Sequence, residues 1–426
     1  MVCSVFKLFI LSNRQFLILT LIMLVPAGAF RYHSSSKEYK QLKVMTKQSS
    51  LGQYYTPSDI AVRIVEKALK IIGKSPSRTL ELAAGEGHLL AAIELKAPNC
   101  KMYAIDIDDA NCSSLKEMHP DYETFNADAT KPIDFLDKLT FDFALGNPPF
   151  LNNVTVDLFI QSLLSSTLNI EIKTGKKIRA EYVFLCQYMN FLKKNGILAI
   201  ILPDSIISGV KSRIFREALL RKFSIEEIVE LNGSPFSKTE AKTHVLFIRN
   251  RCPNKIETKL SSFDVNKKSI MVLNDSLVDR MDFTFHKAKN KITGTRQLLN
   301  YATIQRGKLT HIDLKMMGED YIHSTTFDKD FYLPIKSISP NKSYVTKGDV
   351  IMCRVGSRVA GKIRVYNGDP VLFTDCIYKI HFKENNIKND FLSFITSTGG
   401  KESLMSLLRG VCSKYITKSD LESIFF

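Results

Sequence analysis

The stretch Arg78-Thr-Leu-Glu-Leu-Ala-Ala-Gly-Glu-Gly-His88 decides the fold. Its first five residues, Arg78–Leu82, predict a short buried β-strand. Gly85 and Gly87 follow, and an apolar helix start at Leu89–Leu95 comes next. Glycines between a strand and a helix let the backbone approach a ligand and leave the N–H groups of the first helical turn free to bind it. The pattern alone fits any nucleotide-cofactor fold, and it fits a structural tight turn equally well.

Strands and helices alternate on both sides of this turn. The apolar patterns predict strands at Lys101–Ile107, Phe141–Leu145, Ile197–Leu202 and Thr243–Ile248, and helices at Ile60–Ile72 and at Glu181–Leu192, the latter ended by Asn195-Gly196. This order predicts an α/β fold with a doubly wound parallel sheet and with ligands at the carboxyl ends of its strands. Asp106 ends the strand after the glycine turn, where a carboxylate can accept hydrogen bonds from ribose hydroxyls.

Asn147-Pro148-Pro149-Phe150 follows the strand predicted at Phe141–Leu145. The two prolines fix the backbone and remove two N–H donors. The carbonyl groups and the Asn147 amide oxygen then converge as acceptors beside an aromatic ring, which suits a planar substrate that carries an NH₂ group. Positioning of that group supplies much of the rate without a strong base. A simple Pro-Pro loop is the alternative interpretation.

These residues resemble the S-adenosyl-L-methionine-dependent amino-methyltransferases, and in particular the adenine-specific DNA methyltransferases of type I and type IIG restriction–modification systems. The resemblance covers about residues 50–250 and implies a Rossmann-like methyltransferase sheet. Within Gly52-Gln-Tyr-Tyr-Thr-Pro57, it places Thr56 near the methionine part of the cofactor. The other cofactor contacts that it implies are Glu81, Gly85, Gly87, the ribose-binding Asp106, and Asp128 at the adenine amino group.

The same resemblance assigns the catalytic motif to Asn147, Pro148 and Phe150. The amino group of a paired adenine lies inside the duplex, so the base must be flipped out and sandwiched. Phe150 is implied on one face of the base and Phe236, in Pro235-Phe236-Ser-Lys, on the other. Each stacking contact contributes on the order of 1–3 kcal/mol. The sequence departs from the family at Leu82, where proline is common, but this change removes no functional group.

The C-terminal part is basic and has a resemblance of its own. Residues 251–426 carry 28 basic and 18 acidic side chains, whereas residues 45–250 carry 25 and 24. A basic excess favours a polyanionic partner, nucleic acid before membrane. The stretch from Val345 to Ser357, with Lys-Gly-Asp-Val at its centre, is similar to the target-recognition domain of type I specificity subunits. This resemblance covers residues 295–426 and implies a mixed α+β domain that binds double-stranded DNA, with Arg354, Ser357 and Lys362 as candidate contacts.

Four parts are therefore predicted, namely an extension at 1–44, a methyltransferase domain at 45–250, a connector at 251–294 and a target-recognition domain at 295–426. The extension holds an apolar run at Phe16–Val25 followed by Pro-Ala-Gly-Ala, as in a signal peptide. An organellar transit peptide is an alternative. We favour a mis-assigned start upstream of Met45 or a dispensable extension, and a cytoplasmic protein without stable membrane association, because the chemistry needs a cytosolic cofactor and DNA. The eight cysteines form no CxxC pair and no cluster with zinc spacing, so no metal is expected.

Rival functions share part of this pattern. The Asn-Pro-Pro-aromatic motif also resembles methyltransferases of release-factor glutamine and of ribosomal RNA guanine, but a recognition domain disfavours both. A non-catalytic DNA-binding specificity protein is disfavoured by the intact Asn147, Asp106 and Asp128. The extension is too short for a nuclease domain. The sequence thus predicts a stand-alone enzyme that methylates adenine in DNA, with any partner restriction endonuclease encoded separately.

Overall fold

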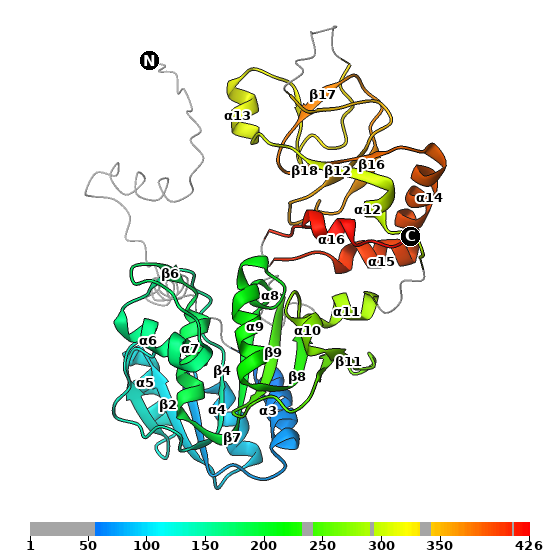
Figure 1. Cartoon of the computed structure of the whole chain (residues 1–426). Coiled ribbons are helices and arrows are strands. Elements are labelled where there is room, and N and C mark those ends of the chain that lie inside the picture. Colours follow the sequence, from blue (N-terminus) through cyan, green and yellow to red (C-terminus); the bar gives the residue numbers. More distant parts are fainter. Residues whose placement is uncertain (1–55, 232–241, 290–293, 333–341, 411–412) are drawn as a thin grey trace, which may run out of the picture. The chain divides into compact units, whose positions relative to one another are not determined.

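The computed structural model describes residues 56–231, 242–289, 294–332, 342–410 and 413–426 (Figure 1). The predicted extension, residues 52–55 of the N-terminal motif and Phe236 lie outside these ranges. No helix in the described part of the chain is long and apolar enough to cross a membrane.

A nine-stranded sheet forms the centre of the methyltransferase part, in the order β11-β10-β8-β9-β7-β4-β1-β2-β3. Its strands are β1 (Arg78–Leu82), β2 (Lys101–Asp106), β3 (Glu123–Asn126), β4 (Phe141–Gly146), β7 (Leu192–Pro203), β8 (Ser224–Leu231), β9 (Thr243–Arg249), β10 (Glu257–Ser262) and β11 (Ile270–Leu273). The pairs of β1 with β2 and β4, of β2 with β3 and of β4 with β7 are parallel. Every residue of β4 is buried, as expected for a strand covered on both faces.

Helices cover both faces of this sheet (Figure 1). Their bounds are α3 (Ser58–Ile72), α4 (His88–Lys96), α5 (Asp109–Met118), α6 (Leu158–Leu168), α7 (Ala180–Phe191), α8 (Asp204–Ile207), the 3₁₀ turn η1 (Val210–Ser212) and α9 (Arg213–Lys222). The strands β5 (Val154–Thr155) and β6 (Lys177–Ile178) precede and follow α6 and pair as a small antiparallel sheet. Alternate residues of β4 enter two separate cores: Ala144 packs with α6 and α7, whereas Phe143 and Leu145 pack with α3 and α4. This alternation confirms the predicted layered α/β fold.

Two features of the sheet differ from the prediction. The helix predicted at Glu181–Leu192 ends at Phe191, but the predicted stop Asn195-Gly196 lies within β7, which starts at Leu192. Asn195 has a φ of 67°, and the register between β4 and β7 shifts nearby. Asparagine tolerates this left-handed conformation, so the pair forms an irregularity within a strand. The sheet is also not wholly parallel, because β9 runs antiparallel to both β7 and β8.

The predicted connector at 251–294 is not a plain linker. β10 extends the sheet parallel to β8, and β11 pairs antiparallel to β10 at the edge. The helices α10 (Asn274–Leu277) and α11 (Phe283–Lys289) follow. Leu260 and Val272 are buried and bring this segment into the core.

The C-terminal part has the expected mixed α+β composition. Its elements are α12 (Leu298–Tyr301), β12 (Ala302–Arg306), α13 (His311–Met316), β13 (Tyr321–Ile322), β14 (Tyr344–Val345), β15 (Val350–Cys353), β16 (Ile363–Val365), β17 (Val371–Phe373), β18 (Ile377–Phe382), α14 (Asn385–Thr396), α15 (Thr398–Ser406) and α16 (Lys418–Glu422). The strands form two small sheets, β12-β18-β15-β16 and β13-β17-β14. Two hydrophobic clusters of their own support these sheets.

Candidate active site

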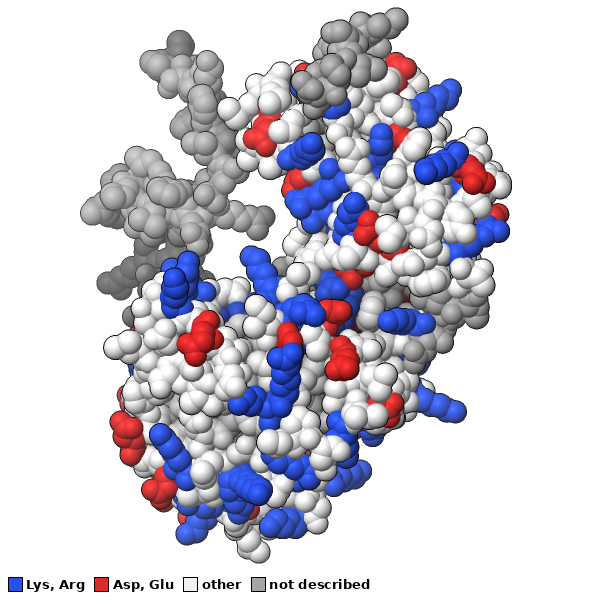
Figure 2. Space-filling model, viewed as in Figure 1, with Lys and Arg blue, Asp and Glu red and all other residues white. Residues whose placement is uncertain are grey.

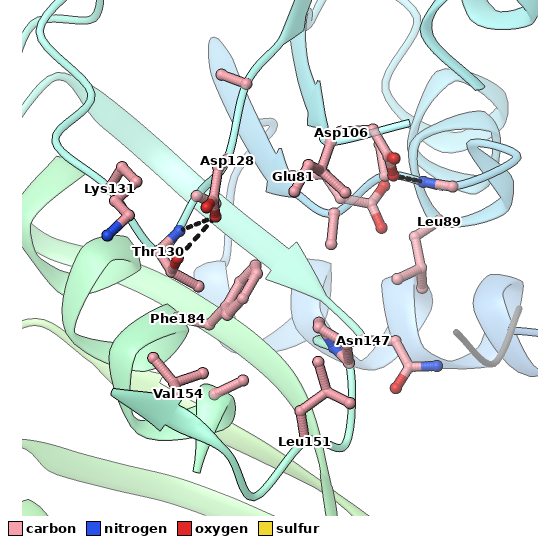
Figure 3. Close-up of a pocket in the computed structure, with 18 of the residues that line it drawn as sticks. Glu81, Leu89, Asp106, Asp128, Thr130, Lys131, Asn147, Leu151, Val154 and Phe184 are labelled. Carbon is pink, nitrogen blue, oxygen red and sulfur yellow. Dashed lines mark hydrogen bonds between the residues drawn. The ribbon is translucent and has the colours of Figure 1, made fainter. Parts of the chain in front are cut away.

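The candidate site lies where the strand order of the large sheet reverses. From β1 the chain proceeds outward to β2 and β3, and it then returns to β4 on the other side of β1. Such a switch point leaves a crevice at the carboxyl ends of the strands. A cavity of about 400 Å³ opens there (Figure 3). The predicted site residues that line it are Thr56, Glu81, Gly85, Asp106, Asp128 and Asn147.

The glycine turn is tied to the end of the neighbouring strand β2. The N–H of Gly85 donates to Asp106 Oδ2 at 2.7 Å (Figure 3), and the N–H of Asp108 donates to Asp106 Oδ1 at 2.8 Å. Gly87 has a φ of 77°, and a Cβ there would lie against the Leu115 side chain. The structure therefore gives Asp106 a role in shaping the turn that sequence reasoning did not foresee.

Glu81 is a buried acid in the wall of the cavity. It is 2% exposed, and its Oε2 has no hydrogen-bond partner among the described residues. Burial and the neighbouring Asp106 raise the pKa of this carboxyl well above its usual range. A buried carboxyl oxygen without a described partner fits a cationic group, and S-adenosylmethionine carries an ammonium and a sulfonium centre. The cavity therefore fits this cofactor.

Asp128 lines the cavity from the segment after β3, and Figure 3 shows it beside Thr130. Its Oδ1 accepts from the N–H of Thr130 at 2.8 Å and from the Thr130 hydroxyl at 2.7 Å. Between Asp128 and Asn147, the ring of Phe184 from α7 forms an apolar wall. The sequence holds no signal for Phe184, because a buried aromatic residue on a helix has the pattern of an ordinary core residue.

Ile107 is a lining residue that the sequence could have revealed. It lies between Asp106 and Asp108 at the end of β2, and it is 54% exposed although it is apolar. An apolar side chain between two acids at the carboxyl end of a strand is suited to the face of a planar ring.

Asn147 is held at the edge of the cavity by the N-terminal segment. Its Nδ2 donates to Thr56 Oγ1 at 3.3 Å, and His88 Nδ1 lies 2.8 Å from the carbonyl oxygen of Thr56. Thr56 therefore links helix α4 to the candidate catalytic motif.

The rest of the motif is divided between the cavity and the core. Pro149 and Leu151 line the cavity, whereas Pro148 is buried. Phe150 is half-buried, packs against the core formed with α3 and α4, and is not a lining residue. Its role in stacking on a base stays a prediction.

The three candidate DNA contacts differ in their surroundings. Arg354 is 16% exposed, and its Nε donates to the carbonyl oxygen of Asp375 at 2.7 Å. The side chain of Lys362 is 52% exposed, and its Nζ lies 3.6 Å from Asp328 Oδ2. Ser357 is exposed in the turn after Arg354. Figure 2 shows Lys and Arg side chains spread over much of the visible face. Arg354 thus has a structural partner, and the more accessible groups lie further along the same loop.

Part of the chain is similar in sequence to known methyltransferases. Residues 77–236 match the family described as Eco57I restriction-modification methylase. The type II methyltransferase M.HincII of Haemophilus influenzae is 26% identical over 204 residues, which are 47% of this chain and 38% of that protein. The rRNA N(6)-adenosine-methyltransferase metl-5 of Caenorhabditis elegans is 32% identical over 120 residues, which are 26% of this chain and 56% of that protein. The chain spans less than two thirds of the length of either relative.

A solved structure extends the likeness in fold. The type IIG restriction endonuclease BpuSI superposes with a TM-score of 0.52 at 13% identity, over 87% of this chain and 58% of that chain. Residues 77–236 are therefore similar to the Eco57I restriction-modification methylases, and S-adenosylmethionine is the cofactor that such methylases use.

Proposed function

We propose that the chain transfers a methyl group from S-adenosylmethionine to the exocyclic amino group of adenine, at a short specific sequence in duplex DNA. One observation carries the proposal: Asn147, at the end of β4, lines the same cavity as Glu81, Asp106 and Asp128. An acceptor for an amino group thereby lies beside a site that suits the methyl donor. The family match and the names of the relatives support a nucleic-acid substrate and an adenine target.

Each residue then has a defined task. Glu81, Asp106 and Asp128 hold the cofactor, which supplies an electrophilic methyl carbon when it is bound. The Asn147 amide oxygen and a motif carbonyl accept the two amino hydrogens and direct the nitrogen lone pair at that carbon. The new N–C bond forms as the S–C bond breaks, and one amino proton leaves to solvent. Most of the rate comes from holding these groups in line.

The target base must leave the duplex to reach this site. Phe150 and Phe236 are the proposed stacking faces. Residues 295–426 are the proposed target-recognition domain, with Arg354, Ser357 and Lys362 as its candidate contacts and with residues 251–294 joining it to the methyltransferase domain. A separate restriction endonuclease would complete a restriction–modification system.

The proposal is tested by single-molecule sequencing of DNA from cells that express the chain. Methylated adenine confined to one short motif supports it, provided that Asn147→Ala expressed at the same level leaves the motif unmethylated. Asn147→Ala should still bind S-adenosylmethionine, because its side chain is not a proposed cofactor ligand. Methylation by the variant at the wild-type level would contradict the role of Asn147.

Adenosine in structured RNA is a second candidate, favoured by the 32% identity to metl-5. Incubation of the purified chain with tritiated S-adenosylmethionine and either unmethylated genomic DNA or ribosomal RNA separates the two. Label in RNA alone would overturn the DNA assignment and keep the adenine chemistry.

A further inference from the structure

Leu82 is the last residue of β1, and it lies where two parallel strands separate. On one side the pairing of β1 with β2 continues to Leu82 and Ile105. On the other side the pairing of β1 with β4 stops one residue earlier, at Glu81 and Leu145. The backbone N–H and C=O of one residue in a strand point to the same side. Those of Leu82 therefore lose their strand partner at the switch point that holds the candidate site.

The hydroxyl of Tyr188 takes the place of that strand partner. Tyr188 Oη accepts from the N–H of Leu82 at 2.7 Å and donates to the carbonyl oxygen of Leu82 at 2.8 Å. The side chain comes from α7 and is fully buried. Burial and the charge of Glu81 raise the pKa of this phenol, which keeps the proton it donates. One oxygen thus satisfies two buried backbone groups, each of which is costly to leave without a partner.

The same oxygen also touches the end of β4. A Cβ added at Gly146 would collide with Tyr188 Oη, and it would lie 2.9 Å from Cζ of the same ring. Gly146 directly precedes Asn147, and Leu82 directly precedes the glycine turn. A single hydroxyl therefore lies between two strand ends. The end of β1 leads to the cofactor turn, and the end of β4 leads to the catalytic motif.

We propose that Tyr188 is a positioning residue whose hydroxyl sets the spacing between the glycine turn and Asn147. The inference rests on the proposed function, because that spacing fixes the distance from the methyl donor to the target amino group. A misplacement of about 1 Å between reacting groups can lower a rate by about 100-fold. Tyr188 itself is not a lining residue of the cavity, so it would act through the two strand ends.

Single-turnover methylation by the full-length chain tests this role. The assay uses tritiated S-adenosylmethionine and unmethylated genomic DNA, both at saturating concentration, and the stoichiometry of cofactor binding gives the concentration of folded enzyme. Tyr188→Phe should lower the rate by about 10- to 100-fold, while the Kd for S-adenosylmethionine changes by a smaller factor. If a lower concentration of folded enzyme accounts for the whole loss of rate, the positioning role is overturned.

Tyr182→Phe is the matched control. Tyr182 lies on the same helix and its hydroxyl donates to Ser212 Oγ at 2.8 Å, away from both strand ends. This variant removes the same atom from a half-buried tyrosine, so its rate should stay within about twofold of wild type. An equal loss in both variants would mean that removing any hydroxyl from α7 slows transfer, and it would overturn the proposal.

Gly146→Ala reaches the same contact from β4, and it keeps the inference testable if Tyr188→Phe does not fold. The added methyl group collides with the hydroxyl, so this variant should also be slow. In Tyr188→Phe the closest clash with the added methyl group is gone. The double variant should therefore have a higher rate than the rate expected if the two single losses multiplied. Losses that simply multiply would show that the hydroxyl does not link the two strands.

The outcomes separate the two proposals. A wild-type chain that binds S-adenosylmethionine but labels neither DNA nor RNA overturns the proposed function, and the inference with it. A wild-type chain that labels DNA while Tyr188→Phe matches its rate overturns the inference alone.

Discussion

Glu81 is a buried acid whose surroundings favour its protonated form in the cofactor-free chain. Because burial and Asp106 raise its pKa, the folded state keeps a proton that the unfolded state releases above its own pKa of about 4.3. The free energy of unfolding therefore falls as the pH rises above about 4.3. Glu81→Gln removes this loss, so the cofactor-free variant should melt at a higher temperature than wild type at pH 7 and at nearly the same temperature at pH 4.

Cofactor binding should change in the opposite direction. The ionised Glu81 carboxylate is the proposed partner of a cationic group, so Glu81→Gln should raise the Kd for S-adenosylmethionine by about tenfold or more, the equivalent of one charge-assisted hydrogen bond. Thermal melts in a pH series and calorimetric titration measure the two effects on the same protein. A variant that is both less stable and an equally good binder would remove Glu81 from the cofactor site.

Asp106 has both a structural role and a proposed role as a cofactor ligand, so its loss should lower both stability and cofactor affinity. Asp106→Ala removes the acceptor of the Gly85 N–H together with the proposed ribose acceptor. The Kd for S-adenosylmethionine should rise by more than about tenfold, and the melting temperature should fall. Asp109→Ala is the control, because Asp109 is an exposed residue in the first turn of α5. Unchanged affinity in Asp106→Ala, measured by calorimetry, would show that Asp106 is not a cofactor ligand.

At the scale of elements, strands buried on both faces were the most predictable. β1 and β4 are buried almost throughout, and their observed bounds agree with the sequence to within a residue. The short edge strand β11 was missed because its exposed positions, Met271 and Leu273, are apolar, so the sequence shows no alternation of apolar and polar residues. The start of β7 was placed too late, because Asn195-Gly196 has the local pattern of a helix stop and only the pairing with β4 makes it part of a strand.

The candidate site also contains residues that local sequence predicts and residues that depend on the assembled sheet. Asp106, Asp128 and Asn147 line the cavity as the sequence predicted, because each lies at or just after the carboxyl end of a strand. Thr56 also lines it, and its prediction came from the motif before the first helix. Tyr188 could not be found, because its partners are backbone atoms of Leu82, more than a hundred residues away, and local sequence does not record them. Contacts of this kind require the assembled sheet.

Asp142 joins β4 to the start of β1 and shows how one side chain fixes two elements. It accepts from the N–H groups of Ser77 at 3.0 Å and of Arg78 at 3.1 Å, and it pairs with Lys193. Burial alone would raise the pKa of this carboxyl, but the bonds from Lys193, Ser77 and Arg78 outweigh burial and lower the pKa to about 2. Its contribution to stability is therefore present above the unfolded pKa of about 3.9 and is lost as the pH falls towards 2.

Asp142→Asn should lower the free energy of unfolding by about 1–3 kcal/mol at pH 7. The difference from wild type should shrink between about pH 4 and pH 2. Urea denaturation at several pH values measures this, with Asp134→Asn as an exposed control before β4. A difference that is constant across this range would mean that the charge of Asp142 contributes nothing.

At the scale of the whole molecule, the first question concerns residues 1–44. The proposed chemistry uses only residues from Thr56 onward, and the family match begins at residue 77. A chain that starts at Met45 should therefore fold and transfer methyl groups at the wild-type rate in vitro. The melting temperature and single-turnover rate of the two chains provide the comparison. Failure of the shorter chain to fold would show that the extension is part of the domain.

The basic excess of residues 251–426 leads to a prediction about salt. If this part holds DNA through its phosphates, log K for DNA should fall linearly with log salt, with a slope of about −0.9 for each phosphate contact. The Kd for S-adenosylmethionine, bound in the cavity, should depend much less on salt.

Arg358 is exposed and has no ion pair or hydrogen bond among the described residues, whereas Arg354 is bound to Asp375. Arg358→Ala should therefore reduce the slope by about one phosphate contact without changing stability, whereas Arg354→Ala should lower the melting temperature. Fluorescence anisotropy in a salt series decides this, with Lys74→Ala after α3 as the control. An Arg358 variant with the wild-type slope would place the phosphate contacts elsewhere on the molecule.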